Sequence, residues 1–561
     1  MKLTPLAKAF IALIILGVLG YTGYHYYGDQ LKEWSKGKGS GDKKTGTGTG
    51  SGSGSGSGTT TAEVGKDDFK NLGKAGDPDR DKGVSGVTAG NVGDGKLGRT
   101  LVVGINTWAG HAPGIVSNGG LDAGNAASLY KKQYGLDVKF VLLEDPQAKL
   151  TAFIKGEIDI MWDTVDSWAR EASTLAEQKI PAKAIIQQDW SRGGDGIVSL
   201  NTIKSIEDLK GKTIATTRYT PSHWLLLYML AQSGLTTEEK KEIEKKLVFT
   251  AEAPLAAAAF KAKKVDAAVT WEPDLSGAVK AREDEAHVLV STAAATNVIA
   301  DCLVARQDVI DKAPTTLRDF VHGWFDGIDS IAKDPQGAYT LVGKALKLGP
   351  DDVSGMLSGL KLTPFADNAL FFGLTGSGDH AQFKSLFETA FVVWRKQGVV
   401  SKAVEAKDYV DSRFVAALAD KYQGQKVVEP FRFDPKEAKD PKARAIVNKS
   451  LSIYFTPGSD EIMGGSFFTL DSLGDTMIAF GNTFLRIEGN TDSKGSAKVN
   501  KTLSERRAES VKKYLIKNFN IPEARFQTIG HGSDNPVAPN ETEAGRQQNR
   551  RTDIKVVLNA Q

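Results

Sequence analysis

Near the end of the chain, an aspartate and an arginine stand in two short motifs that could hold a ligand carrying both charges. Asp492 lies in the segment IEGNTDSKG, and Arg507 lies in the helix-like segment LSERRA. A carboxylate accepts hydrogen bonds from an ammonium group, and a guanidinium clamps a carboxylate through two parallel N–H donors. The pair therefore suits a ligand that displays an amino group and a carboxylate on a wet surface.

Three motifs occur here in order, IEGNTDSKG, LSERRA and GRQQNRR, with a helical stretch at residues 511–519 and an IGHGSDNP segment between them. The ordered set resembles the OmpA-like peptidoglycan-binding domain over nearly its whole length. The resemblance implies that Asp492 and Arg507 grip the diaminopimelate residue of the peptidoglycan stem peptide. It also implies a set of supporting positions for the turn, the helix and the pocket wall: Gly489, Thr491, Asn500, Leu503 and Arg551.

One position departs from the family pattern. Asn490 stands where the family usually has a histidine, which leaves details of the pocket open but not the ion-pair clamp. The alternative is that Asp492 and Arg507 pair with each other or with neighbours on the surface.

The other end of the chain predicts a membrane anchor. Lys2 and Lys8 precede a mostly apolar run at residues 9–27 that is finished by tyrosines and is about long enough to span a bilayer. Basic residues before the run and tyrosines after it predict a cytoplasmic amino terminus. No small-x-small cleavage site follows, and the lone cysteine, Cys302, rules out a lipoprotein. We expect residues 1–34 to be an uncleaved, single-pass signal anchor in the bacterial inner membrane.

Residues 35–98 are dominated by Gly, Ser, Thr, Lys and Asp and lack apolar periodicity. Such a composition is typical of a flexible linker rather than a domain.

From residue 99 to about 433, short apolar segments alternate with helical stretches, a pattern typical of a parallel or mixed α/β sheet. The predicted strands are residues 100–105, 137–143, 158–162, 184–188, 212–216, 267–271 and 286–290. Two segments, IEDLKGKTIATTRYTPSHWLLLYMLAQSGL at 206–235 and AAFKAKKVDAAVTWEPD within 258–274, resemble periplasmic solute-binding proteins of the nitrate, sulfonate and taurine ABC-transporter class. The resemblance implies two α/β lobes with a ligand cleft between them.

Side chains at the carboxyl ends of the predicted strands are the candidates for lining that cleft. A tryptophan at such an edge brings an indole N–H that needs a partner, although any one of them could simply pack inside a lobe. The predicted solute-binding residues are Trp108, Trp162, Asp163, Trp190, Thr220, Ser222, His223, Trp271 and Glu272.

The charge of the solute stays open. A helix start carrying Thr220, Ser222 and His223, with Arg218 nearby, suits an anion such as a sulfonate, phosphonate or carboxylate. Acids beside tryptophans, such as Asp163 and Asp189, suit a cation or an amino group. The family's usual Gly-Ser pair is replaced by YTPS at residues 219–222, so anion binding does not carry over. The prediction is a small organic solute.

Composition and motifs exclude several classes of function. Lys plus Arg number 71 against 68 Asp plus Glu, which is too balanced to indicate a nucleic-acid partner. The histidines lack metal-ligand spacing, and no catalytic motif is present. Cys302 fits a small core residue better than a nucleophile. We expect no enzymatic activity, no metal and no cofactor.

The sequence thus predicts an α/β protein with an amino-terminal transmembrane helix, a two-lobed domain at residues 99–433, a short linker at 434–447 and an α/β OmpA-like domain at 448–561. The expected partners are peptidoglycan, a small organic solute, the inner membrane, and an ABC permease or another membrane protein that reads the closed lobes. Such a protein would act in the periplasm as a sensor, receptor or transport adaptor. The alternative is an envelope-tethering scaffold whose lobes bind a protein. An ion-driven stator is disfavoured, because residues 9–24 hold no carboxylate.

Overall fold

The structure is a computed structural model that describes residues 95–375, 382–400, 402–428, 431, 433, 445–456, 458–519 and 521–559. The predicted anchor and nearly all of the predicted linker at 35–98 lie outside these residues. Among the helices that the structure does describe, none has the length and apolar character needed to cross a bilayer.

The first lobe is built on a six-stranded mixed sheet in the order β11-β4-β10-β3-β1-β2. Its strands β1, β2 and β3 pair in parallel, whereas β10 runs antiparallel to β3 and β4. The bounds are β1 (Leu101–Ile105), β2 (Val138–Leu142), β3 (Ile160–Thr164), β4 (Ala182–Ser191), β10 (Ala300–Arg306) and β11 (Leu360–Leu362). The helices before β4 are α2 (Ala112–Asn118), α3 (Leu129–Tyr134), α4 (Pro146–Lys155) and α5 (Val165–Glu177).

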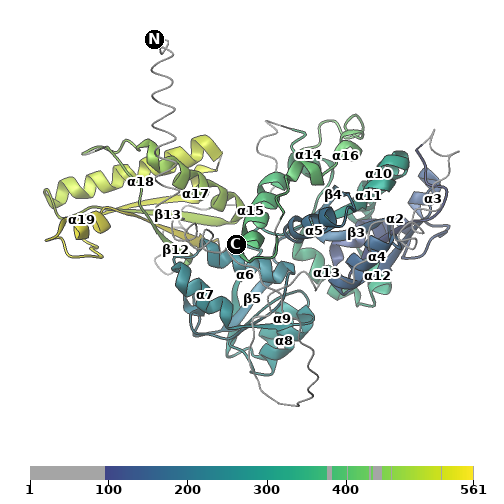
Figure 1. Cartoon of the computed structure of the whole chain (residues 1–561), viewed down its shortest axis with the longest axis horizontal. Coiled ribbons are helices and arrows are strands. Elements are labelled where there is room, and N and C mark those ends of the chain that lie inside the picture. The colour runs from purple at the N-terminus through teal and green to yellow at the C-terminus, as the bar shows by residue number, and fades with distance from the viewer. Residues whose placement is uncertain are drawn as a thin grey trace, which may run out of the picture. The chain divides into compact units, whose positions relative to one another are not determined.

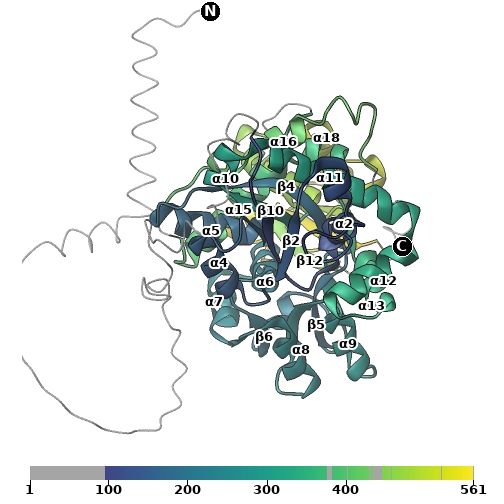
Figure 2. The same ribbon diagram turned by 90° about the vertical axis from the view of Figure 1, so that its right-hand side faces the viewer.

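The second lobe is a five-stranded sheet in the order β7-β6-β8-β5-β9. Its strands are β5 (Asp195–Leu200), β6 (Ile214–Thr217), β7 (Leu247–Thr250), β8 (Ala267–Trp271) and β9 (Ala286–Ser291). Helices α6 (Pro221–Gln232), α7 (Thr237–Lys245), α8 (Ala253–Lys261) and α9 (Asp274–Ala281) surround the sheet, with α8 and α9 packed against its strands (Figure 2). Strand β5 runs antiparallel to β8 of the parallel β7-β6-β8 core, and β9 pairs antiparallel with β5.

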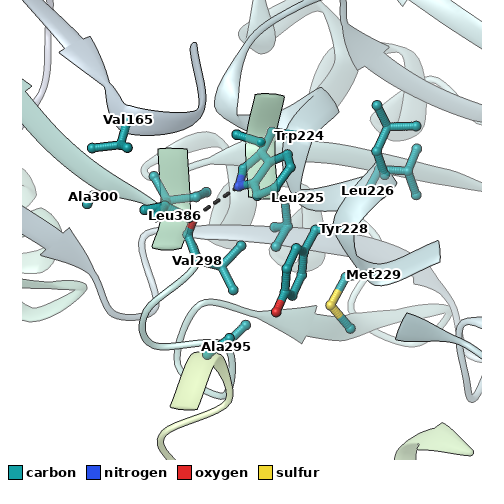
Figure 3. Close-up of a cluster of buried hydrophobic side chains, with 14 of the residues drawn as sticks. Val165, Trp224, Leu225, Leu226, Tyr228, Met229, Ala295, Val298, Ala300 and Leu386 are labelled. Carbon is teal, nitrogen blue, oxygen red and sulfur yellow. Dashed lines mark hydrogen bonds between the residues drawn. The ribbon is translucent and has the colours of Figure 1, made fainter. Parts of the chain in front are cut away.

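The chain passes between the lobes twice, from β4 to β5 and back from β9 to β10. Trp224 of α6 is fully buried beside the returning segment, where its indole Nε1 donates to the carbonyl of Val298 at 2.9 Å (Figure 3). After β10 the first lobe gains its remaining helices: α10 (Gln307–Lys312), α11 (Pro314–Lys333), α12 (Pro335–Leu346), α13 (Pro350–Ser358), α14 (Phe365–Phe371), α15 (Gln382–Lys396) and α16 (Arg413–Ala416).

The carboxyl-terminal domain is a four-stranded sheet in the order β12-β15-β13-β14. Its elements are β12 (Ala445–Leu451), α17 (Phe467–Ala479), β13 (Thr483–Asn490), α18 (Ala497–Phe519), β14 (Phe526–Gly532), α19 (Glu543–Asn549) and β15 (Thr552–Leu558), drawn in green to yellow in Figure 1. Helix α18 packs directly on β13 and β14. This close approach depends on glycine, because a Cβ at Gly489 would lie 2.3 Å from the carbonyl oxygen of Ser504.

The observed architecture confirms the predicted α/β class, the two lobes and the terminal α/β domain. Each of the seven predicted strands overlaps an observed one. Sequence reasoning missed four strands of the lobes, β5, β7, β10 and β11. Two of these, β5 and β10, run antiparallel to their neighbours and carry residues of the site described below.

Candidate functional site

A cavity of about 320 Å³ is lined by residues of both lobes. The first lobe contributes residues at or just beyond the carboxyl ends of β1 and β3, where parallel strands end at one edge of the sheet. The second lobe contributes the ends of β6 and β8 and the starts of α6 and α8. The side chains used in the argument below are Trp108, Lys149, Trp162, Asp163, Glu171, Asp195, Tyr219, Thr220, Trp271 and Asp301.

Lys149 of α4 is fully buried in the wall of this cavity. Its Nζ lies 3.1 Å from Glu171 Oε2, 3.6 Å from Asp163 Oδ1 and 4.6 Å from the centre of the Trp162 ring. Burial alone lowers the pKa of Lys149, but the carboxylates of Asp163 and Glu171 outweigh burial and raise that pKa. An ammonium group is therefore already held here by two acids and an indole face.

Further carboxyl groups gather beside this ion pair. Asp301 of β10 lies across from Asp189 of β4 in the sheet register, and Asp195 begins β5. Burial, with the charge of neighbouring carboxylates added, raises the pKa of Asp195 to about 7 and that of Asp189 to about 8. The same two causes raise the pKa of Asp301 well above its usual range. The cluster thus holds more carboxyl groups than Lys149 can pair with, and the raised pKa values of Asp189 and Asp301 keep these two groups largely protonated near neutral pH.

Five of the nine predicted solute-binding residues line the cavity, namely Trp108, Trp162, Asp163, Thr220 and Trp271. Trp190 does not. Its ring is buried inside the protein, where it packs edge-on against Phe371 with ring centres 5.5 Å apart. The prediction placed Trp190 at a strand end, but β4 continues to Ser191 and pairs with β11, so this position faces core.

The other three predicted residues also lie outside the lining. His223 is buried between Trp394 and Phe249, and its Nδ1 accepts a hydrogen bond from the backbone N–H of Tyr219 at 3.3 Å. Burial, followed by the nearby Arg218 charge, lowers the pKa of His223 to about 3, so the ring is neutral.

Ser222 is likewise buried away from the cavity. The carboxylate of Glu272 accepts from the backbone N–H of Ser276 at 3.1 Å and from its hydroxyl at 2.8 Å. The Glu272 side chain therefore supports the start of α9.

Lys149, Asp195 and Asp301 are among the lining residues that sequence reasoning missed. Asp195 and Asp301 stand on β5 and β10, the antiparallel strands that were not predicted. An available signal was the apolar run around Asp301 at residues 298–305, since an acid inside a buried strand is unusual and needs an explanation.

The carboxyl-terminal domain has a second, smaller cavity of about 160 Å³. Its wall includes Tyr454, Phe455, Asn490, Arg507, Arg550 and Arg551. Arg507 donates from Nε to the carbonyl of Ser459 at 3.0 Å, and its guanidinium lies 4.8 Å from the centre of the Phe455 ring. These two contacts orient the Arg507 guanidinium at the cavity wall.

Asp492 stands beside this cavity, with its carboxylate held by Arg550. Arg550 Nη1 donates to Asp492 Oδ2 at 2.6 Å, and the backbone N–H of Lys494 donates to Oδ1 at 2.9 Å. The amide of Asn500 donates to the backbone carbonyl of Asp492 at 3.2 Å, which fixes the loop. The sequence left open whether Asp492 and Arg507 pair with each other or with neighbouring residues. In the structure, Asp492 pairs with its neighbour Arg550.

The remaining predicted positions support the same region. Thr491 donates its backbone N–H to the carbonyl of Gly532 at 2.8 Å, and Leu503 is half-buried on α18. Arg551 lines the cavity and its Nε donates to Asp553 Oδ1 at 3.1 Å. The amide of Asn490 donates to the other oxygen of Asp553 at 3.0 Å, while Asn490 Oδ1 is buried without a hydrogen bond from the described residues.

Comparison with known proteins agrees with this geometry in two separate regions. Residues 129–338 match the "NMT1/THI5 like" family model, and residues 454–550 match the "OmpA family" model. The chain joins an NMT1/THI5-like domain to a carboxyl-terminal OmpA domain. The OmpA domain contains Asp492 and Arg507, and the NMT1/THI5-like match contains Lys149 through Asp301.

The OmpA domain has curated relatives in several bacteria. It is 32% identical over 120 residues to outer membrane porin F of Pseudomonas aeruginosa. The aligned region covers 21% of this chain and 34% of that protein. It is 32% identical over 111 residues to the peptidoglycan-associated lipoprotein of Pseudomonas putida, covering 20% of this chain and 66% of the relative. This chain thus spans about a third of the length of the porin relatives it matches.

Among solved structures, the NMT1/THI5-like domain aligns with the periplasmic aliphatic sulphonate binding protein SsuA of Escherichia coli. The two are 17% identical with a TM-score of 0.45, over 57% of this chain and 99% of SsuA.

Proposed function

We propose that this protein is a binding protein of the bacterial envelope. Its NMT1/THI5-like domain captures a small organic solute between the two lobes, and its OmpA domain attaches the chain non-covalently to peptidoglycan. The observation that carries the proposal is the cavity of about 320 Å³ lined by both lobes, where aromatic rings and buried polar groups converge. Enclosure by apolar walls with a few converging polar groups is typical of small-molecule sites.

Attachment to peptidoglycan rests on the second cavity and on the relatives. Arg507 at its wall offers a guanidinium for a carboxylate of the stem peptide, and Asp492 offers a carboxylate for an ammonium. One of these relatives, the lipoprotein of Pseudomonas putida, is named for its association with peptidoglycan. The clamp of Asp492 and Arg507 is therefore part of the proposal.

The wall-binding half is tested by sedimentation of the full-length protein with purified peptidoglycan sacculi. Asp492→Asn and Arg507→Ala each remove one half of the clamp, and each is expected to reduce the pelleted fraction at least tenfold. Arg506→Ala is the matched control, because Arg506 is the next residue on α18 and makes a weak surface contact with Asp460 at 3.9 Å. Pelleting that is unchanged in both clamp variants would reject this assignment.

The solute-binding half is tested by the melting temperature of the full-length protein with sulfonates, phosphonates, phosphate, nitrate, amino acids, polyamines and pyrimidines. A ligand that binds only the folded state raises the melting temperature in a saturable way. A saturable rise with one class supports a receptor, sensor or transport adaptor. An unchanged melting temperature with every class would favour a tethering scaffold whose lobes contact another protein.

The proposal also places the protein in the inner membrane through residues 1–34, on the sequence pattern alone. Sucrose-gradient separation of the two membranes tests this placement. Full-length protein is expected with the inner-membrane fraction, and a variant that begins at residue 35 with a cleavable export signal is expected in the soluble periplasmic fraction.

A further inference from the structure

The cavity between the lobes has a marked excess of acid. Six carboxyl side chains line it, namely Glu144, Asp163, Glu171, Asp195, Glu252 and Asp301. Lys149 is the one basic residue among its described lining residues, and it is already paired with Asp163 and Glu171. An anionic solute would therefore find no unpaired cation among these lining residues, whereas a bound cation would favour ionisation of the carboxyl groups.

One of these carboxyl groups, that of Asp195, presents an unused acceptor. Asp195 is 3% exposed. Asp195 Oδ2 accepts from the hydroxyl of Ser191 at 2.7 Å, but its Oδ1 accepts no hydrogen bond from the described part of the chain. A buried acceptor without a donor is costly, so Asp195 Oδ1 indicates a missing donor, and Asp195 lines the cavity.

Several potential donors of the cavity wall are, by contrast, already engaged with the protein. The indole of Trp108 donates to Asp189 at 3.3 Å, and the hydroxyl of Thr220 donates to the carbonyl of Thr217 at 2.7 Å. The indole of Trp162 and the hydroxyls of Thr107, Thr164, Ser167 and Thr217 also have protein partners. These indole and hydroxyl groups are therefore already used by protein acceptors rather than held ready for the oxygens of a sulfonate or phosphate.

The start of α6, which the sequence suggested as an anion site, does not supply such donors from Pro221, Ser222 or His223. Pro221 at the first turn has no backbone N–H to donate, and neither Ser222 nor His223 lines the cavity.

A metal ion is also a poor fit. Within the described residues, no group of three or more His, Cys, Asp or Glu side chains is arranged to hold a metal. The acids are instead interleaved with the rings of Trp108, Trp162, Tyr219 and Trp271. Aromatic faces and carboxylates together favour an organic cation.

We propose that the cavity binds a small organic ammonium compound, a primary or secondary amine in its protonated form on a compact apolar or aromatic body. An ammonium N–H donates to Asp195 Oδ1, and the body lies among the aromatic rings. Lys149 shows the same recognition within the chain, since its ammonium lies between two carboxylates and the face of Trp162. This inference rests on the proposed solute-binding function and narrows its ligand class.

The test is isothermal titration of the full-length protein with matched probes. Benzylamine and butylamine supply the ammonium, benzyl alcohol removes the charge, benzenesulfonate and butanesulfonate reverse it, and tetramethylammonium keeps the charge without an N–H donor. The amines are expected to bind at least tenfold more tightly than the alcohol, the sulfonates and tetramethylammonium. Tighter binding of a sulfonate would overturn the inference while leaving solute binding intact. Absence of binding by all probes, with a thermal response to another solute class, would also overturn it.

Two variants connect the binding to named acids. Asp195→Asn keeps the shape of the side chain and is expected to weaken amine binding at least tenfold. Glu252→Gln alters an exposed lining residue whose side chain makes no capping bond to α8, so it keeps the fold and is expected to weaken amine binding two- to fivefold. Glu283→Gln, an exposed acid of the second lobe outside the lining, is the matched control. Equal amine affinity in all three variants would contradict the inference.

Discussion

Arg550 Nη1 lies 2.6 Å from Asp492 Oδ2, so the carboxylate expected to hold a ligand ammonium has a cationic partner of its own. Arg550 also reaches Glu543 at 2.8 Å, and its side chain is 37% exposed. A partly exposed ion pair is worth little free energy and exchanges readily. We infer that Arg550 keeps Asp492 in place until the ligand ammonium displaces it.

Arg550→Gln should therefore bind peptidoglycan at least as tightly as the unchanged protein, because it removes the competitor for Asp492. The measurement is the binding isotherm from sacculus pelleting, with Arg507→Ala as the comparison that loses binding. A tenfold weaker isotherm for Arg550→Gln would show that Arg550 itself contacts the ligand.

Gly489→Ala should destabilise the OmpA domain by about 1–3 kcal/mol, because the added Cβ would lie 2.3 Å from the carbonyl oxygen of Ser504 on α18. Chemical denaturation followed by circular dichroism measures this loss. Gly464→Ala is the control, since a Cβ there meets no atom within 4 Å. Equal stability of the two variants would mean that α18 does not pack as closely on β13 as described.

Lys149→Met should destabilise the NMT1/THI5-like domain by about 3 kcal/mol, because the buried carboxylates of Asp163 and Glu171 lose their shared counter-ion. Arg170, whose Nη2 lies 2.8 Å from Glu171 Oε1, still offsets part of the negative charge of Glu171 in this variant. Lys210→Met is the control, since Lys210 pairs with Glu239 on the surface, and its unfolding curve should be unchanged. The same unfolding curve for both variants would contradict the buried pairing.

The ligand-free protein should become less stable as pH rises from about 4 to about 8. The pKa of Asp195 is raised to about 7 by burial and by the charge of Glu272, and the pKa values of Asp166 and Asp189 are raised to about 7 and 8. A raised folded-state pKa gives stability that is complete below the unfolded value near 4 and is lost as pH rises through the folded value.

Asp195→Asn removes one of these groups and should flatten the dependence by up to about 1.4 kcal/mol per pH unit. The measurement is the free energy of unfolding at pH 4, 6 and 8 in the unchanged protein and in the variant. A stability that rises across this range in the unchanged protein would contradict the burial of these acids in their protonated form.

The sequence by itself determined the two-lobed and OmpA domains and much of each site. Short apolar runs found β1, β2, β3, β4, β6, β8 and β9, because strands that pack in a core read as short apolar segments. The ends of these strands then gave Trp108, Trp162 and Trp271. Three ordered motifs gave Asp492 and Arg507, because local turn and helix signals lie within a few residues of one another.

Only the tertiary structure decided which side chains meet. Asp195 and Asp301 lie on strands that pair antiparallel with strands from distant parts of the chain. Asp492 accepts a hydrogen bond from Arg550, which lies 58 residues further along the chain. The sequence left the solute's charge open between the α6 start and the acids. In the folded protein, His223 is buried in the core and acidic side chains line the cavity. Such pairings are set by sheet register and packing between distant segments, which local sequence patterns do not encode.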